Sequence, residues 1–274
     1  MIKIYTFASN RADFITLQAY SFRKHLKEEF EFIIFNNAKF DITGGADYAG
    51  IHAVGKAAGA QVIDVVRDME LVNRCQAIES GGPVLASSGQ YANANVAHAY
   101  ALRWAWENHI SKEKDIIAIL DSDVFLIQPV NLTEELGSHQ MLNISDGKPR
   151  PAEPDRPILY MWPTFFVADM ARLPDAGTLN WWCGRIEGVP VDVGGQTYHY
   201  FQAHLDLDVV NVRHLHSYYL DESSCEVHPA NYDEFYLTNA IVLHYRSGSN
   251  WNHQTKEFHQ KKTEWLKRRI EEGK

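Results

Sequence analysis

The chain has 274 residues, of which 26 are basic and 35 are acidic, so its formal charge is −9. This length and a hydrophobic content of 45% suffice for one large α/β domain with a buried core, and the negative charge argues against nucleic acid as a partner, since phosphate backbones are bound by basic surfaces. No stretch approaches the ~20 apolar residues of a membrane span, and the apolar run at the N-terminus is too short for a signal peptide.

The first part of the chain alternates between strand and helix patterns. Residues 2–8, 31–35 and 60–66 are short runs of apolar and β-forming residues, which predict strands. A helix is predicted to begin near Asn10, because apolar residues then recur at helical spacing, and the Ala- and Gly-rich residues 46–58 predict a second helix. This order predicts a parallel sheet with helices on its faces.

A long helix and a buried strand lead to an acidic triplet. Residues 80–89 are rich in Gly, Pro and Ser and predict a loop, after which apolar residues have the spacing of a long helix. Residues 115–120 are nearly all apolar, as in a central strand that is buried on both faces. The sequence Asp-Ser-Asp at 121–123 ends this strand. Ligands of open α/β sheets bind at the carboxyl ends of strands, so this triplet is the most informative local feature.

Two carboxylates one residue apart can hold a hard divalent cation. Asp121 and Asp123 are therefore candidate ligands of Mg²⁺ or Mn²⁺, ions that take oxygen ligands and leave positions for water and substrate phosphates. Such a cation bridges a diphosphate and stabilises negative charge on a leaving group. The alternative is a strand end with solvated acids, because so short a pattern also occurs by chance.

Residues 1–127 resemble the GT-A fold glycosyltransferases, which use nucleotide-sugar donors. The resemblance lies in the N-terminal parallel sheet, the helix containing NANVAHAYALRWA and the strand that enters LDSDVF. It implies an α/β fold with a mostly parallel, Rossmann-like central sheet and helices on both faces. It also implies that the acidic triplet, Ser122 included, binds the donor diphosphate through a metal. The first strand and its loop would bind the nucleotide, through Thr6, Phe7, Ala8, Ser9 and Asn10. Arg11, beside this loop, is a candidate phosphate contact or a solvated arginine.

A histidine near the C-terminus is a third candidate metal ligand. GT-A enzymes similar to glycogenin place a metal-binding histidine in a segment of the form HxxGxxKPW, and the resemblance assigns this role to His244. Here Gly248 comes one residue late, and the lysine and proline are absent. Arg246 is the candidate phosphate contact in place of the lysine. The alternative for His244 is a structural histidine at a strand end.

The segment after the polar, Pro-rich residues 146–157 supplies candidates for acceptor binding. Residues 158–168 predict a strand. Asp192 is a candidate general base for an acceptor hydroxyl in an inverting enzyme, whereas a retaining enzyme would not need one; the alternative is an aspartate that forms a turn. Further candidates for contacts with the acceptor are Gly194, Gly195, Gln196, Trp162 and Trp182.

The glycines would let the backbone approach a ligand closely, and the tryptophans would stack on sugar faces. Core packing is the alternative for each tryptophan. The adjacent Trp181 and Trp182 cannot both face inward on a strand, so we expect one of them to line a groove.

The last segment, residues 253–274, predicts an amphipathic helix with seven basic and four acidic side chains. We expect its apolar side to pack on the domain, with peripheral contact to a membrane that holds a lipid-linked acceptor as the alternative. The three cysteines have no CxxC spacing and are typical of reduced thiols, which favours a cytoplasmic location. The domain interpretation is a single catalytic unit over 1–252, with a donor half at 1–127 and an acceptor half at 128–252.

Together these features favour a metal-dependent glycosyltransferase, in particular a hexosyltransferase. It would move a sugar from a nucleotide-diphosphate sugar to a hydroxyl acceptor on a glycan, lipid or protein. One alternative is a protein that binds carbohydrate or nucleotide sugar without catalysis. A phosphatase of the haloacid dehalogenase type would carry its acidic triplet on the first strand. A sugar-nucleotide pyrophosphorylase would need a Gly-rich loop after that strand, and SNRADF is not one.

Overall fold

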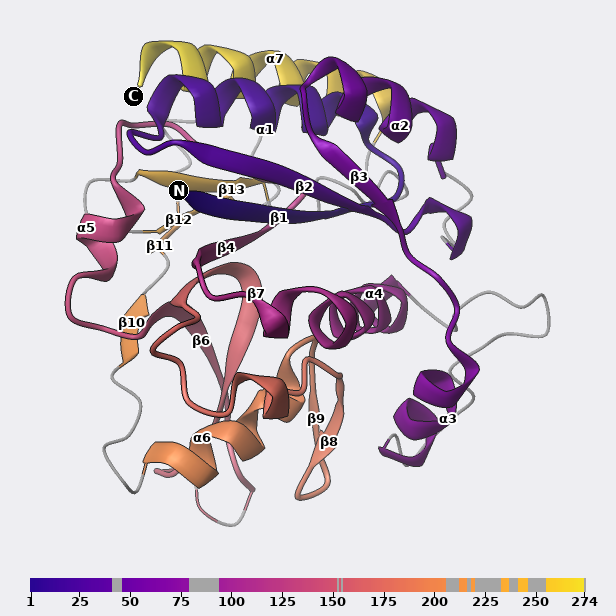
Figure 1. Cartoon of the computed structure of the whole chain (residues 1–274), viewed down its shortest axis with the longest axis vertical. Coiled ribbons are helices and arrows are strands. Elements are labelled where there is room, and N and C mark those ends of the chain that lie inside the picture. Colours follow the sequence, from indigo (N-terminus) through magenta and orange to yellow (C-terminus); the bar gives the residue numbers. More distant parts are fainter. Residues whose placement is uncertain are drawn as a thin grey trace.

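The computed structural model describes residues 1–40, 46–78, 94–151, 153, 155–205, 212–215, 218–219, 233–236, 241–245 and 255–273. Its centre is a seven-stranded sheet in the order β10-β6-β7-β4-β1-β2-β3 (Figure 1). These strands are β1 (Ile2–Ala8), β2 (Phe30–Asn36), β3 (Gln61–Asp64), β4 (Ile116–Asp121), β6 (Met141–Lys148), β7 (Ile158–Asp169) and β10 (Val212–Leu215). Within this sheet only β7 is antiparallel to its neighbours, so the predicted mostly parallel sheet is confirmed.

Helices cover both faces of this sheet, also as predicted (Figure 1). Helices α1 (Ala12–His25) and α2 (Tyr48–Ala57) pack on one face, and α4 (Ala94–Asn108) packs on the other. Along β4, Ala118 and Leu120 belong to the core under α1, while Ile117 and Ile119 belong to the core under α4. This two-sided burial is why the strand is a continuous apolar run.

A second, antiparallel sheet has the order β11-β12-β13-β5. Its strands are β5 (Val124–Leu126), β11 (Tyr218–Tyr219), β12 (Asp233–Tyr236) and β13 (Val242–Tyr245). The remaining elements are α3 (Met69–Ile78), α5 (Leu132–Leu136), α6 (Tyr198–Leu205), α7 (Lys256–Glu272) and the hairpin of β8 (Gly184–Ile186) and β9 (Val189–Val191), with 3-10 turns at 38–40, 110–112, 176–178 and 195–197. The chain thus passes from the large sheet into the small one between β4 and β5, directly at the acidic triplet.

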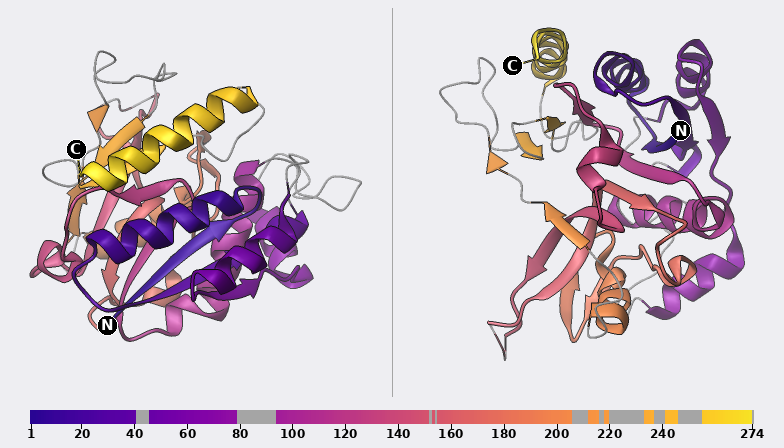
Figure 2. Two further views of the ribbon diagram at one scale, coloured as in Figure 1. Left: turned by 90° about the horizontal axis from the view of Figure 1, so that it is seen from above. Right: turned by 60° about the vertical axis from the view of Figure 1, so that its left-hand side comes forward.

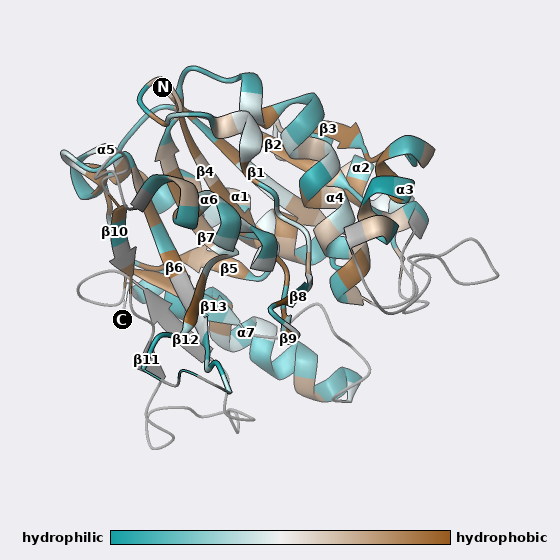
Figure 3. Ribbon diagram, turned by 90° about the horizontal axis from the view of Figure 1, so that it is seen from below, coloured by the Kyte–Doolittle hydropathy of each residue, from teal (hydrophilic) through white to brown (hydrophobic). Residues whose placement is uncertain are grey.

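The C-terminal helix α7 forms one layer with α1 and α2, and the three lie side by side in Figure 2. Its Trp265, Leu266 and Ile270 are buried against residues of α1, β5 and β13. The apolar side of α7 therefore packs on the domain, as predicted, and Figure 3 shows the rest of the helix as mostly hydrophilic. Within the described ranges, every helix is too short or too polar to cross a membrane.

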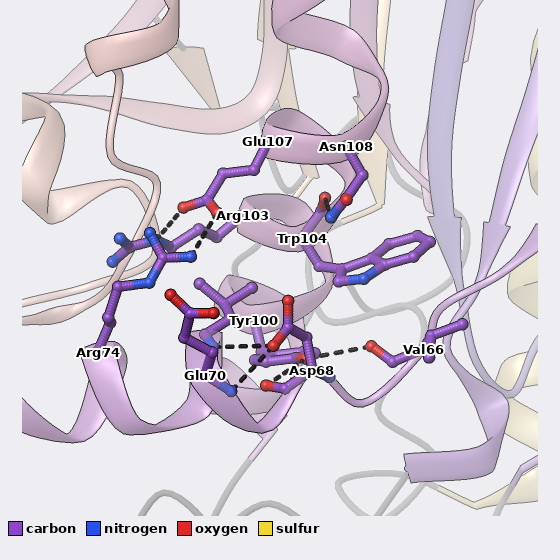
Figure 4. A network of polar contacts seen from close by, with 10 residues as sticks. Val66, Asp68, Glu70, Arg74, Tyr100, Arg103, Trp104, Glu107 and Asn108 are labelled. Atoms are coloured by element: carbon purple, nitrogen blue, oxygen red, sulfur yellow. Dashed lines mark hydrogen bonds and ion pairs between the residues drawn. The ribbon is translucent and has the colours of Figure 1, made fainter.

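Polar contacts hold α3 on α4 (Figure 4). The Asp68 carboxylate accepts hydrogen bonds from the backbone N–H groups of Glu70 and Leu71 at the start of α3. The Asp68 N–H in turn donates to the hydroxyl of Tyr100 on α4, at 2.6 Å. Arg74 of α3 bonds Glu107 of α4 at 2.8 Å. The sequence patterns did not predict α3, since its apolar face is short and its caps come from the preceding loop.

Two boundaries, the start of α1 and the end of β6, differ from the sequence-based predictions. Helix α1 begins at Ala12 with Arg11 at the N-cap and no side-chain capping bond, so Asn10 is not its cap. Strand β6 extends to Lys148, into the segment that was predicted to be a polar connection. The loop predicted at 80–89 lies outside the described residues.

Candidate functional site

The acidic triplet lies in the tight connection between β4 and β5. Ser122 and Asp123 are 8% and 5% exposed, so the connection is largely enclosed. The buried side chain of Gln18, on α1, donates to the carbonyls of Asp121 (2.7 Å) and Val124 (2.9 Å). Sequence reasoning missed Gln18. Its signal is a polar residue within the apolar stripe of α1, where burial requires hydrogen-bond partners.

The environment of Asp121 disfavours the charged form of its carboxyl group. Withdrawal from water raises its pKa above the ordinary range, and the nearby Asp123 raises it further, while His98, His244 and Thr164 act in the opposite direction. The Nε2 atom of His98, on α4, lies 3.2 Å from Oδ1 of Asp121. No hydrogen-bond donor among the described residues is aligned with that oxygen. A cation at this position would supply the missing compensation.

Strand β13 brings His244 to the second carboxylate. Nε2 of His244 lies 3.6 Å from Oδ1 of Asp123, and the two side chains are 4% and 7% exposed. The ring of Trp162 meets the His244 ring edge-on, with centroids 5.6 Å apart. The Tyr245 N–H donates to the carbonyl of Asp123 at 2.8 Å. Two residues far apart in the sequence are thus neighbours in the fold.

The ligand atoms that Asp121, Asp123 and His244 offer fit a divalent cation. Two carboxylates and one imidazole can provide protein ligands, and the remaining positions suit water and phosphate oxygens. The under-compensated oxygen of Asp121 points to the same conclusion. In the described part of the chain, however, no three His, Cys, Asp or Glu side chains are already gathered as a metal requires. The side chains would have to adjust as an ion binds.

A bulge in β7 completes this side of the site. Asn143 pairs with Phe166 and the next residue of β6, Ile144, pairs with Trp162, so residues 163–165 have no matching partners in β6. On the other side Leu120 pairs with Phe165, which places Thr164 at the position next to Asp121. Bulges often lie beside functional sites. A proline at position 163, within an apolar strand, was the sequence signal for this one.

The predicted nucleotide-binding residues fall into two groups. Thr6, Phe7 and Ala8 are buried in β1, where Phe7 is stacked on Phe35 at 5.3 Å. Ser9 and Asn10 are half-buried in the loop after the strand. Because β1 and β4 are parallel neighbours, this loop lies at the same sheet edge as the acidic triplet. A role in donor binding remains a prediction, and the loop residues are better placed for it than those in the strand.

The structure corrects the prediction for Arg11. Its side chain is buried, with the guanidinium 3.6 Å above the ring of Phe14. It donates to both carboxylate oxygens of Asp13, at 2.8 and 2.7 Å, and to the hydroxyl of Thr263 on α7 at 3.0 Å. Arg11 is therefore not a solvated arginine, and a phosphate contact would require it to leave these partners. It joins α1 to α7.

The two glycines of the Asp192 segment are explained by packing. Gly194 has φ +82°, and a Cβ atom there would lie 2.1 Å from the carbonyl oxygen of Met161. A Cβ atom at Gly195 would lie 2.2 Å from the side chain of Val191. The close approach inferred from sequence is thus to neighbouring protein, at Met161 of β7 for Gly194 and at Val191 of β9 for Gly195.

Asp192 and Gln196 stabilise this turn. Oδ1 of Asp192 accepts from the Val193 N–H at 2.8 Å, and its carbonyl accepts from the Gly195 N–H at 2.9 Å. Gln196 is 4% exposed and donates to the Arg185 carbonyl at 3.3 Å. The turn-forming alternative for Asp192 agrees with these contacts, and its proposed proton transfer remains a prediction.

The prediction that one of Trp181 and Trp182 lines a groove is wrong, and Trp182 offers no exposed ring to an acceptor. Trp181 and Trp182 are both 0% exposed. They lie in an irregular segment between elements, so the alternation of a strand does not apply to them. Trp181 packs edge-on against Trp106 and Phe166. Arg246, the candidate phosphate contact, lies outside the described residues.

No protein-family model and no curated protein matches the chain. Among solved structures, the galactosyltransferase LgtC in complex with donor and acceptor sugar analogs is 13% identical, with a TM-score of 0.36, over 62% of this chain and 58% of that chain. An active-site mutant of LgtC is 15% identical, with a TM-score of 0.36, over 62% and 57%. Core-mannan synthase A from Aspergillus fumigatus, in an Mn/GDP form, is 11% identical, with a TM-score of 0.39, over 64% and 62%. The chain thus spans less than two thirds of the length of each of these solved chains.

Proposed function

We propose that this protein is a glycosyltransferase that binds a nucleotide-diphosphate sugar through a divalent cation held by Asp121, Asp123 and His244. The observation that carries the proposal is the convergence of these side chains at the carboxyl end of β4, where His244 and Asp123 approach to 3.6 Å. The mostly parallel sheet with this triplet at its ligand-binding edge supports it. So does the resemblance of residues 1–127 to GT-A enzymes.

The chain's own residues divide the work of such a reaction. When bound, Mn²⁺ or Mg²⁺ would neutralise the diphosphate and stabilise the leaving group. Ser9 and Asn10 would contact the nucleotide, and Trp162 would offer its half-buried ring to a sugar. Asp192 would take the acceptor proton if the reaction is inverting. We assign donor binding to residues 1–127 and acceptor binding to 128–252.

A second candidate is a protein that binds nucleotide sugar without catalysis. It is favoured by the turn-forming contacts of Asp192, which account for that carboxylate without a catalytic role. Release of nucleoside diphosphate from a nucleotide sugar separates the two candidates, because a binding protein would retain the donor intact.

The test is a thermal-shift titration of the whole protein with UDP and GDP, each with and without Mn²⁺. A ligand that binds only the folded state raises stability by mass action, by about 2.7 kcal/mol at 100 times its Kd. We expect a shift that requires both nucleotide and Mn²⁺ and is lost in Asp123→Asn. The control is Asp115→Asn, since Asp115 lies just before β4, at the other end of the strand. A wild-type protein without any Mn²⁺-dependent shift and without release of nucleoside diphosphate would refute the proposal.

A further inference from the structure

Hydrogen bonds to its backbone hold the acidic triplet in place. The Asp123 carbonyl accepts from the Tyr245 N–H at 2.8 Å, and the Asp121 carbonyl accepts from Gln18 at 2.7 Å. Both contacts are made to backbone carbonyls of the triplet and not to its carboxylates. The position of the triplet therefore depends on what fixes Tyr245 and Gln18.

Successive side chains of β13 point to opposite faces of the small sheet. Side chains alternate along a strand, so His244 faces Trp162 and Asp123 while Tyr245 faces away from them. Tyr245 is 5% exposed and belongs to the cluster that includes Phe14 and Trp265. The strand thus connects the candidate ligand His244 directly to the packing beneath α7.

Helix α7 holds the Tyr245 side chain through polar groups. The Tyr245 hydroxyl and Nδ1 of His259 are hydrogen-bonded at 2.9 Å. The ammonium of Lys262 lies 5.3 Å from the centroid of the Tyr245 ring and 4.1 Å from that of Trp265. His259 and Lys262 are 2% and 1% exposed. Burying such groups is costly unless they are partnered, so their contacts define one arrangement more sharply than apolar packing would.

The register of α7 is set at separate points along its length. Thr263 accepts from Arg11 at 3.0 Å. Farther along, the Ile270 carbonyl bonds the ring of His25 at 2.8 Å. The carbonyl of Gly273, just after the helix, accepts from Gln128 at 2.7 Å. These contacts leave α7 little freedom to slide along α1. Helix α7 can therefore hold β13 in one position.

We propose that α7 is a positioning element of the site: through the His259–Tyr245 hydrogen bond it sets the place of Asp123 and His244 for cation binding. Tyr245 and His259 are positioning residues that act through β13 and touch no substrate. This inference rests on the proposed function, since it concerns the same cation. It gives the C-terminal helix a role in arranging the proposed cation site.

The test compares Mn²⁺ binding by the full chain in wild type, Tyr245→Phe and His259→Phe. Both variants remove the hydrogen bond, and the first keeps the ring that packs against Phe14. Residues that support metal ligands typically change affinity 10- to 100-fold, and for this more distant bond we expect about 10-fold weaker binding, measured by EPR of free Mn²⁺. The nitrogen coupling of His244 in the pulsed EPR spectrum of bound Mn²⁺ should weaken in parallel.

The matched control is Ile270→Val, which loosens the same interface at a fully buried residue without touching Tyr245. We expect it to lower the thermal midpoint but to keep Mn²⁺ affinity within about twofold of wild type and the nitrogen coupling intact. Wild-type affinity in both hydrogen-bond variants, or an equal loss in the control, would overturn the inference alone. A wild-type protein that binds no Mn²⁺ would overturn the cation site of the proposed function, and the inference with it.

Discussion

Replacing Gln18 with leucine should destabilise the protein out of proportion to the small change in volume. The side chain is fully buried, and its Nε2 donates to the carbonyls of Asp121 and Val124. Leucine fills similar space but donates nothing. An unsatisfied buried polar group costs about 1–3 kcal/mol. The bond to Val124 is wholly buried and that to Asp121 only partly, so the sum is about 2–4 kcal/mol.

The assay is thermal and urea unfolding of wild type and Gln18→Leu. For a domain of this size each kcal/mol corresponds to roughly 2 °C, so the midpoint should fall by roughly 4–8 °C. Mn²⁺-dependent nucleotide binding should weaken as well, because the released turn carries Asp121 and Asp123. The control is Gln128→Leu, which removes a single, partly exposed bond to Gly273 and should cost at most about 1 kcal/mol. A Gln18→Leu protein within about 0.5 kcal/mol of wild type would refute the reasoning.

Three further predictions follow from burial. Gly194→Ala should destabilise the protein by more than about 2 kcal/mol in urea unfolding, because the new Cβ meets the Met161 carbonyl oxygen and φ is +82°; a neutral result would contradict the packing role of this glycine. Burial lowers the pKa of His25 in the folded state. Below about pH 6.5 the unfolded state therefore binds a proton that the folded state does not bind, and the free energy of unfolding should fall as the pH drops. The thermal midpoint of His25→Gln should depend less on pH over this window, and an unchanged pH dependence would count against it. Burial raises the pKa of the Cys75 thiol to about 12, so iodoacetamide at pH 8 should label it only after unfolding, as peptide mass spectrometry can show.

Short sequence patterns were enough to predict the strands that are continuous apolar runs. Residues 2–8, 31–35 and 115–120 were recognised as strands because each is a short apolar run, and each lies within the central parallel sheet. Helix α3 was missed because its stability comes from Tyr100 and Glu107 of a later helix. Its own apolar face is too short to be distinctive.

The role of a polar side chain depended on partners that the sequence does not bring near. Arg11 beside the first loop suggested a phosphate contact, but Thr263 and Asp13 occupy its guanidinium. Trp182 suggested an exposed platform, but an irregular backbone lets it share the core with Trp181. In both cases the tertiary structure decides which residues surround the side chain. The residue type alone was compatible with a binding role and with a structural one.

The sequence by itself determined that an acidic triplet ends a buried strand of a mostly parallel sheet, since the apolar run and the order of elements depend only on neighbouring residues. The tertiary structure decided which side chains meet that triplet. His98, Thr164 and His244 come from a helix, a bulged strand and a second sheet, and their approach depends on how these elements pack. It also decided that α7 lies beneath the site, because only the three-dimensional arrangement joins Tyr245 to His259.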